Sequence, residues 1–105
     1  MQVIWSKEAN DQLVQIISYG TDHFGNNASL KLYRRFWNTT QLLASQPYMG
    51  KSEPLLAENP KGYRSLYIPP HYKIIYCVDI IIGSIYISNI WDTRRDPDRL
   101  AAVIK

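Results

Sequence analysis

Cations and tyrosines are the side chains of this 105-residue sequence with the most capacity for chemistry, and they gather in its second half. The whole chain carries a formal net charge of +3. A concentration of positive charge suits a partner that carries phosphates or carboxylates, although a solvated basic face with no partner would give the same pattern. The cations of the second half include Lys61, Arg64, Lys73, Arg94, Arg95 and Arg99.

Few other residues offer catalytic groups. The sequence has no glycine-rich phosphate loop, closely spaced histidine pair or serine-elbow pattern, so nucleotide hydrolysis, zinc catalysis and esterase chemistry lack support. His71 falls in a predicted turn, where a solvated residue is commoner than a catalyst. The single cysteine, Cys77, is interpreted as a small filler on a strand, and the lack of a disulfide pair favours a reducing cytoplasm. We expect no metal and no cofactor, so any chemistry must come from Glu, Lys, Arg, Tyr or His.

Two amphipathic helices are predicted in the first half, after a short strand over residues 2–5. Ser6 should cap the first helix, which runs to about Phe24, and Gly25-Asn26-Asn27 should separate it from a second helix over residues 28–45. Apolar residues three and four apart predict one buried stripe on each helix. The first stripe is Ala9, Leu13, Ile16, Ile17, Gly20 and Phe24, and the second is Leu32, Tyr33, Phe36, Trp37, Thr40 and Leu43.

Three consecutive strands are predicted from the period of two in residues 63–68, 72–79 and 84–91, and their short connections indicate antiparallel pairing. The long, turn-rich segment before them either packs down or carries function. Asp96 and Pro97 predict the N-cap and the first residue of a last helix. The predicted fold class is α+β: an N-terminal strand, a two-helix hairpin packed on an antiparallel sheet of about four strands, and a short C-terminal helix, all in one domain.

Strand alternation divides the predicted sheet into a core face and an open face. The side chains expected to meet the helices are Tyr72, Ile74, Tyr76, Val78, Leu66 and Ile68, with Trp37 and Trp91 as further core aromatics. The open face should combine Lys73 with Tyr63, Ser65 and Tyr67. Rings interleaved with cations suit RNA, because bases stack on rings while cations neutralise phosphates. Tyrosine is also a common strand residue, and a protein partner fits this face about equally well.

Several short motifs occur in the same order as in a known family of small proteins. Val3-Ile4-Trp5-Ser6 opens a helix with an alanine three residues on, and a proline and a glycine follow the second helix. Later come Glu53-Pro54-Leu55, Gly62-Tyr63 and Lys73-Ile74-Ile75-Tyr76. Over nearly its whole length the chain resembles the RelE/ParE superfamily of toxins from type II toxin–antitoxin systems, and the three later motifs are most similar to the YoeB branch.

The YoeB likeness implies a metal-independent endoribonuclease that cleaves mRNA in the ribosome, with the RNA 2′-OH as nucleophile. Glu53 would be the general base, and Lys73 would replace the arginine that binds the scissile phosphate. Arg64 and Arg94 would help to stabilise the phosphorane charge. The remaining candidate contacts to RNA or to another target are Tyr63, Tyr67, His71, Lys61 and Arg95.

The end of the chain departs from the YoeB pattern, which finishes in a His-Tyr pair that takes part in cleavage. Here the last strand continues into Asp92-Thr93-Arg94-Arg95-Asp96-Pro97, similar to the arginine-rich segment of ParE-like members, which inhibit DNA gyrase and have no known hydrolytic site. Three hypotheses follow: mRNA cleavage, gyrase inhibition without catalysis, or an inactive member that acts as a binding module. Each implies a cognate antitoxin as partner. No membrane contact is expected, because the apolar stretch 74–91 reads as two strands and a turn.

Overall fold

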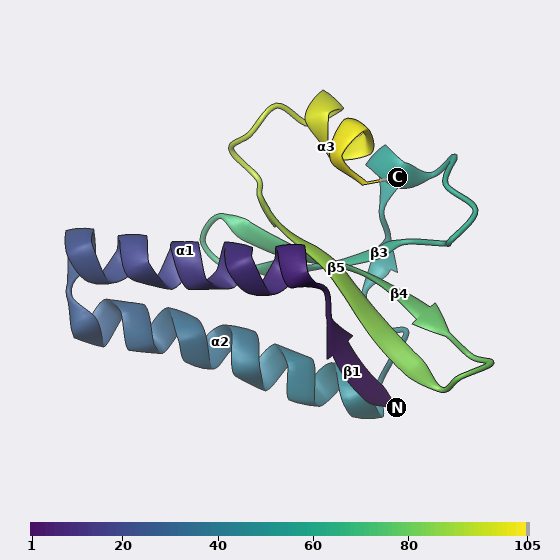
Figure 1. Ribbon diagram of the computed structural model, residues 1–105, viewed down its shortest axis with the longest axis horizontal. Coiled ribbons are helices and arrows are strands. Elements are labelled where there is room, and N and C mark those ends of the chain that lie inside the picture. Colours follow the sequence, from purple (N-terminus) through teal and green to yellow (C-terminus); the bar gives the residue numbers. More distant parts are fainter. Residues whose placement is uncertain (105) are drawn as a thin grey trace.

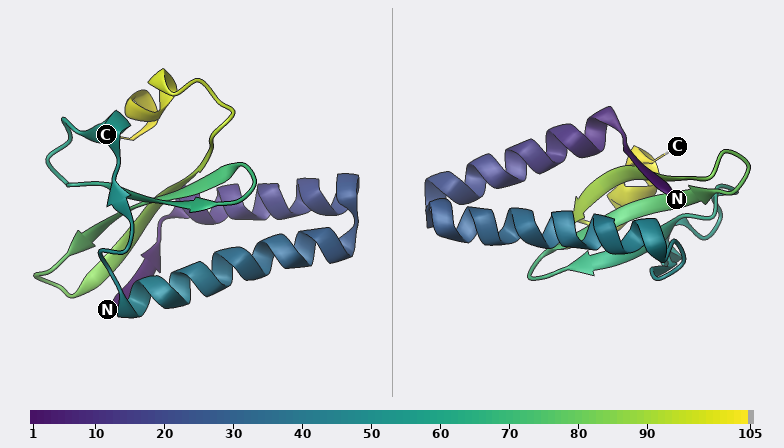
Figure 2. Two further views of the ribbon diagram at one scale, coloured as in Figure 1. Left: turned by 180° about the vertical axis from the view of Figure 1, so that it is seen from behind. Right: turned by 90° about the horizontal axis from the view of Figure 1, so that it is seen from below.

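Two long helices lie side by side against one face of a five-stranded sheet, and a short helix lies against the other face (Figures 1 and 2). The computed structural model describes residues 1–104. Its elements are β1 (Gln2–Trp5), α1 (Lys7–Phe24), α2 (Asn26–Ser45), β2 (Lys51–Ser52), the short 3-10 helix η1 (Pro54–Leu56), β3 (Arg64–Ile68), β4 (Tyr72–Asp79), β5 (Ser84–Asp92) and α3 (Asp98–Val103).

The sheet has the order β1-β5-β4-β3-β2. Strands β2 to β5 pair antiparallel, as predicted for the second half of the chain, and β1 joins β5 in parallel. The two-residue strand β2 was not predicted. The turn between β4 and β5 spans Ile80 to Gly83, slightly earlier than expected, and Gly83 takes the left-handed conformation (φ +69°) that favours glycine. The predicted α+β architecture is confirmed.

Helix α1 begins and ends where its sequence indicates, whereas α2 begins at Asn26, two residues earlier than predicted. The Ser6 side chain accepts a hydrogen bond from the amide of Ala9 (2.9 Å) and so caps α1. A single residue, Gly25, joins the two helices at φ +88°. Near this link Thr21 Oγ1 donates to Ser29 Oγ (2.8 Å), and Ser29 Oγ donates to the carbonyl of Ile17 (3.0 Å). These bonds tie the distal end of the hairpin together.

The first hydrophobic core lies between this hairpin and the sheet. It buries Ala9, Phe36, Leu43, Ile68, Tyr72, Ile74, Tyr76, Ile85, Ile87 and Ile90. Three predicted core residues were wrong, because Phe24 is 70% exposed, Trp37 is 55% exposed and Tyr33 is 43% exposed. Phe24 lies at the end of a hairpin that extends past the sheet (Figure 1). Tyr33 and Trp37 are four residues apart and share one side of α2, with Trp37 about 100° around the helix from the buried Phe36.

A second core on the opposite face corrects the prediction of an open surface. Helix α3 and η1 lie over this face and bury Leu56, Tyr63, Ile75, Trp91, Leu100 and Ile104. Tyr63 and Ser65, expected to be open, are each 4% exposed. Trp91 is a core residue as predicted, but of this second core. The predicted N-cap at Asp96 was wrong: α3 begins at Asp98, one residue later than expected, and its N-cap is Pro97, which has no side-chain cap. Asp96 Oδ1 accepts the amide hydrogen of Asp98 (3.0 Å) in the turn just before the helix.

No helix in residues 1–104 is long and apolar enough to cross a membrane. Within the same residues, no three His, Cys, Asp or Glu side chains come together as a metal site would require.

Candidate functional site

A buried ion pair joins the predicted general base to the lysine predicted to bind phosphate. Glu53 immediately precedes η1, and its carboxylate accepts the amide hydrogen of Leu55 (3.4 Å). Both carboxylate oxygens lie 2.9 Å from Lys73 Nζ on β4. The Glu53 side chain is 2% exposed and that of Lys73 is 18% exposed. The fold thus brings these two residues together, and their charged groups pair with each other.

Opposing effects act on the Glu53 carboxylate. Burial disfavours its charged form, but the hydrogen bonds and charge of Lys73, with further hydrogen bonds from Ser65 and the Leu55 amide, outweigh burial and hold the pKa of Glu53 below its ordinary value. General bases are most effective when their pKa lies near the working pH. A buried carboxylate with a lowered pKa is therefore poorly placed to accept a proton from RNA.

A pocket of about 450 Å³ opens beside the ion pair and is lined by Lys51, Glu53, Pro54, Ser65, Tyr67, Lys73 and Thr93. Tyr67 is 60% exposed, as its predicted place on the open face requires. Its hydroxyl donates to the carbonyl of Pro70, which fixes the ring over this edge of the sheet. Glu53, Lys73 and Tyr67 are the predicted site residues that this pocket brings together.

Arg64 lies on the other face of the sheet. It pairs with Tyr76 across β3 and β4, so its side chain shares the helix-facing side with Tyr76, whereas Lys73 is on the opposite side. Its guanidinium donates to the carbonyl of Gly50 (2.7 Å) and lies 5.0 Å from the centre of the Tyr48 ring. The structure therefore does not bring Arg64 to Glu53.

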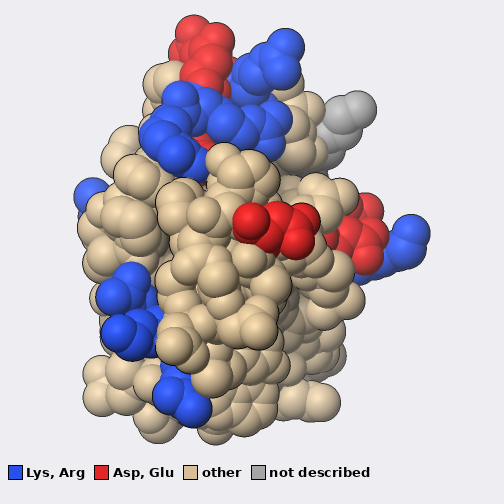
Figure 3. All heavy atoms as spheres, turned by 90° about the vertical axis from the view of Figure 1, so that its left-hand side faces the viewer, with Lys and Arg blue, Asp and Glu red and all other residues tan. Residues whose placement is uncertain are grey.

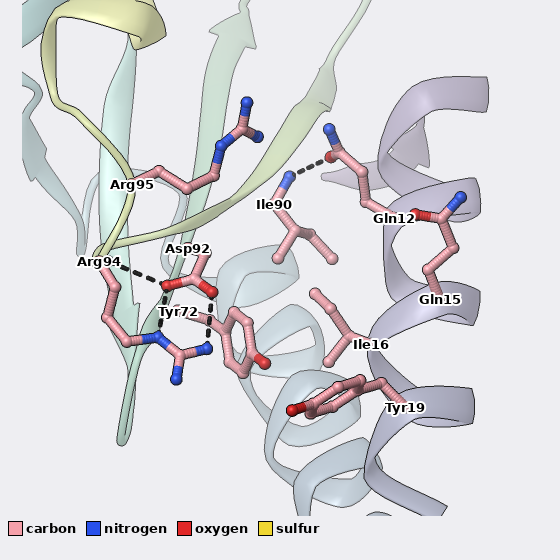
Figure 4. Close-up of a pocket in the computed structure, with 9 residues that line it drawn as sticks. All are labelled: Gln12, Gln15, Ile16, Tyr19, Tyr72, Ile90, Asp92, Arg94 and Arg95. Carbon is pink, nitrogen blue, oxygen red and sulfur yellow. Dashed lines mark hydrogen bonds and ion pairs between the residues drawn. The ribbon is translucent and has the colours of Figure 1, made fainter. Parts of the chain in front are cut away.

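Arg94 and Arg95 line a second pocket, of about 430 Å³, between α1 and the end of β5 (Figure 4). Arg94 forms two side-chain hydrogen bonds to Asp92, Nε to Oδ1 at 3.0 Å and Nη2 to Oδ2 at 2.7 Å. These bonds lower the pKa of Asp92 and raise that of Arg94. Arg95 lies 4.4 Å from the centre of the Trp91 ring, close enough for a cation–π contact.

The rest of this pocket comes from α1 and β4. Figure 4 shows Tyr19 and Tyr72 near Arg94, and Gln12 reaching the backbone of β5. The Gln12 side-chain oxygen accepts the amide hydrogen of Ile90 (2.7 Å), which joins α1 to β5. Figure 3 shows Lys and Arg side chains gathered at the end of the molecule where α3 and the segment before it lie. Asp96 and Asp98 lie in the same part of the chain, so arginines and acidic side chains alternate there, and neither Arg94 nor Arg95 lines the pocket beside Glu53.

The other predicted contacts are dispersed. The carbonyl of His71 accepts hydrogen bonds from the backbone amide (2.6 Å) and the hydroxyl (2.8 Å) of Thr93, so the residue has a clear role in fixing a turn. Tyr63 is buried in the second core. Lys61 lies near Cys77 and lines a hollow at the far end of the sheet. The nine predicted residues therefore do not form one site.

Comparison with known proteins identifies the family. The family model described as the ParE toxin of the type II toxin–antitoxin system parDE matches residues 3–97. The chain belongs to the ParE toxin family. No curated protein sequence matches it.

Among solved structures, a chain of the chromosomal ParDE system from P. aeruginosa is similar at a TM-score of 0.70 and 20% identity, covering 88% of this chain and 95% of that one. The YoeB/ParE toxin from Agrobacterium tumefaciens is similar at a TM-score of 0.60 and 14% identity, covering 88% and 98% of the two chains. At these identities, the likeness concerns the fold.

This ParE-family toxin therefore has an antitoxin as its cognate partner. The family match includes both arginines of the second pocket but ends before α3, so Leu100 and Ile104 of the second core lie outside it. Sequence reasoning missed Asp92, although an aspartate two residues before Arg94 is a short-range signal for such a pair. It also missed Tyr19 and Gln12, for which no signal was available, because their role depends on how α1 packs against β5.

Proposed function

We propose that this ParE-family toxin arrests growth by binding its target without cleaving RNA, and that the target is DNA gyrase. The observation that supports this most is the state of the Glu53 carboxylate: 2% exposed, with both oxygens 2.9 Å from Lys73 Nζ. To act as a base, Glu53 would have to leave this partner and take up a proton against a lowered pKa. With Arg64 on the opposite face, no second cation of the predicted set supports cleavage there.

The arginine-bearing segment after β5 is the better candidate for target binding. Arg94 is held by Asp92 and Arg95 lies over Trp91, so both guanidinium groups are oriented before a partner arrives. Preorganised arginines lose less conformational freedom on binding, and arginine is enriched at interface hot spots. The sequence similarity of this segment to ParE-like gyrase inhibitors supports the same target.

Purified toxin and purified gyrase test the proposal directly. In a DNA supercoiling assay, we expect the wild-type toxin to inhibit gyrase in proportion to its concentration. Arg95→Ala should weaken inhibition at least about tenfold, since a hot-spot arginine contributes more than about 1.4 kcal/mol. Arg34→Ala, which removes the same charge from an exposed position of α2, is the matched control and should inhibit like wild type.

A second candidate, mRNA cleavage in the ribosome, has one observation in its favour: Glu53, Lys73 and the exposed Tyr67 share a pocket. Translating ribosomes incubated with toxin distinguish the two. Ribosome-dependent cuts in mRNA that Glu53→Gln abolishes, with supercoiling intact, would contradict the gyrase proposal. Glu53→Gln toxin that still inhibits supercoiling would support it.

A further inference from the structure

Two acceptor groups of the pocket between α1 and the end of β5 are already bound within the protein (Figure 4). Asp92 is the acidic side chain of this pocket. Its Oδ1 accepts from the Arg94 backbone nitrogen (2.9 Å) and Nε (3.0 Å), and its Oδ2 accepts from Nη2 (2.7 Å). The side-chain oxygen of Gln12 accepts the amide hydrogen of Ile90 (2.7 Å). These oxygens are therefore engaged before any ligand arrives.

The donors of the same pocket are not engaged. Because the side-chain oxygen of Gln12 faces the Ile90 amide, its NH2 group points the other way and offers its N–H donors to the pocket. The Arg95 guanidinium lies over the Trp91 ring, which uses none of its N–H donors. Within residues 1–104, neither the Gln12 NH2 group nor the Arg95 guanidinium forms a hydrogen bond. Figure 4 shows both groups pointing into the space between α1 and β5.

The pocket also keeps a surplus of positive charge. Arg94 and Arg95 bring two positive charges and Asp92 one negative charge, which leaves +1. In the pocket beside Glu53, by contrast, the carboxylate pairs with Lys73. A site with unused donors and surplus positive charge suits a ligand that brings oxygen acceptors and a negative charge. Carboxylates and phosphates are the two groups of this kind that biological partners carry.

Given gyrase as the proposed target, on which this assignment rests, we propose that the pocket receives the carboxylate of an acidic side chain of gyrase. Arg95 binds it through two parallel N–H···O bonds, the geometry in which guanidinium and carboxylate groups match. The NH2 group of Gln12 donates a further hydrogen bond. The bound acid neutralises the surplus charge of the pocket.

A protein carboxylate fits the surroundings of the pocket better than a nucleic-acid phosphate does. Proteins that bind nucleic acids neutralise several phosphates with a series of cations. Here the two arginines are followed by Asp96 and Asp98, and the pocket carries a single surplus charge. Ile16 and Ile90 also line the pocket, so apolar contacts lie beside the donors. An acidic side chain brings methylene groups to such contacts, and a phosphate does not.

Gln12→Glu tests the contact with little change to the fold. The new carboxylate keeps an oxygen for the amide of Ile90 but replaces the N–H donors by a negative charge, so the surplus charge of the pocket falls to zero. Binding of purified gyrase to the toxin, measured without DNA by surface plasmon resonance, should weaken at least about tenfold. Val14→Glu adds the same charge at a 57% exposed position of α1 outside the pocket and should bind like wild type.

A second variant gives an independent readout. Wild-type binding should weaken as the NaCl concentration rises, because salt screens an exposed charge pair. Arg95→Gln, at an exposed position, removes the guanidinium and should bind more weakly at low salt, with a smaller dependence on NaCl. An unchanged urea midpoint for each variant shows that it is folded.

Unchanged gyrase binding in Gln12→Glu, or an equal loss in Val14→Glu, would refute the carboxylate contact and leave the proposed function intact. A wild-type toxin that does not bind gyrase would refute the proposed function, and the contact with it. Binding of DNA alone by the wild type that Gln12→Glu abolishes would assign the pocket to a phosphate. Loss of antitoxin binding in Gln12→Glu, with gyrase binding intact, would assign it to the antitoxin. Either of these results contradicts a gyrase carboxylate.

Discussion

Replacing Lys73 by methionine should destabilise the toxin by about 2 to 3 kcal/mol at pH 7, because it leaves a buried carboxylate without its partner. The upper limit follows from protonation. A carboxyl with an ordinary pKa of 4.5 takes up a proton at pH 7 at a cost of about 3 kcal/mol, so the unpaired charge cannot cost more than that. The hydrogen bonds from Ser65 and the Leu55 amide remain in the variant and reduce the loss.

The same argument predicts how the loss depends on pH. In the wild type, the folded-state pKa of Glu53 is lowered, so its contribution to stability is present above pH 4.5 and is lost as the pH falls through the folded value. In Lys73→Met, burial is no longer opposed by the lysine, so the pKa of Glu53 should rise. As the pH falls, Glu53 of the variant takes up a proton, and the cost of burying its unpaired charge disappears. Both effects reduce the difference in stability between the two proteins toward pH 4.

Urea unfolding at pH 7 and near pH 4 measures this difference through the midpoint, provided that the m-value is unchanged. The double variant Glu53→Gln with Lys73→Met removes both charges and should recover at least half of the loss at pH 7. A loss below about 0.5 kcal/mol at pH 7, or one that does not vary with pH, would refute the reasoning, because exposed ion pairs behave in that way.

Three further changes test the parts of the fold that hold the candidate sites. Ser6→Ala removes the cap of α1 and should lower the free energy of unfolding by about 1 to 2 kcal/mol; an unchanged urea midpoint would contradict the cap. Leu100→Ala should cost about 3 kcal/mol, since Leu100 is fully buried, whereas Leu42→Ala at a 49% exposed position serves as its control. Gly50→Ala should cost about 1 to 3 kcal/mol, because its Cβ would lie 2.6 Å from the Tyr76 hydroxyl oxygen; thermal unfolding at the wild-type temperature would disprove that clash.

The helices and long strands were predictable because their signals are local. Ser6 and Gly25 have residue types that favour a helix cap and a helix break, and the period of two in residues 72–79 appears directly in the sequence. The parallel pairing of β1 with β5 and the two-residue strand β2 were not predictable in this way. Both depend on contacts between distant segments, which no short window of sequence contains.

The candidate site was harder to predict, although strand alternation was applied correctly. It placed Lys73, Ser65 and Tyr67 on one face and Tyr76 on the other, as the structure does. Alternation does not reveal what covers a face. The short α3 buries Leu100 against that face, and Tyr63 and Ser65 lie beneath the covering elements. The prediction of an open face was wrong for Tyr63 and Ser65, because a six-residue helix gives too weak a periodic signal to show where it docks.

The second core also determines how the arginines are presented. Residues 93–97 connect β5 to α3, and each end of this segment is fixed by a residue of that core, Trp91 before it and Leu100 after it. Trp91 in addition supports the guanidinium of Arg95 directly. The sheet face that buries Tyr63 thus also holds the short arginine-bearing segment in a defined position. In this toxin, the covered face and the proposed target-binding surface are therefore parts of one arrangement, and loosening α3 should disturb both.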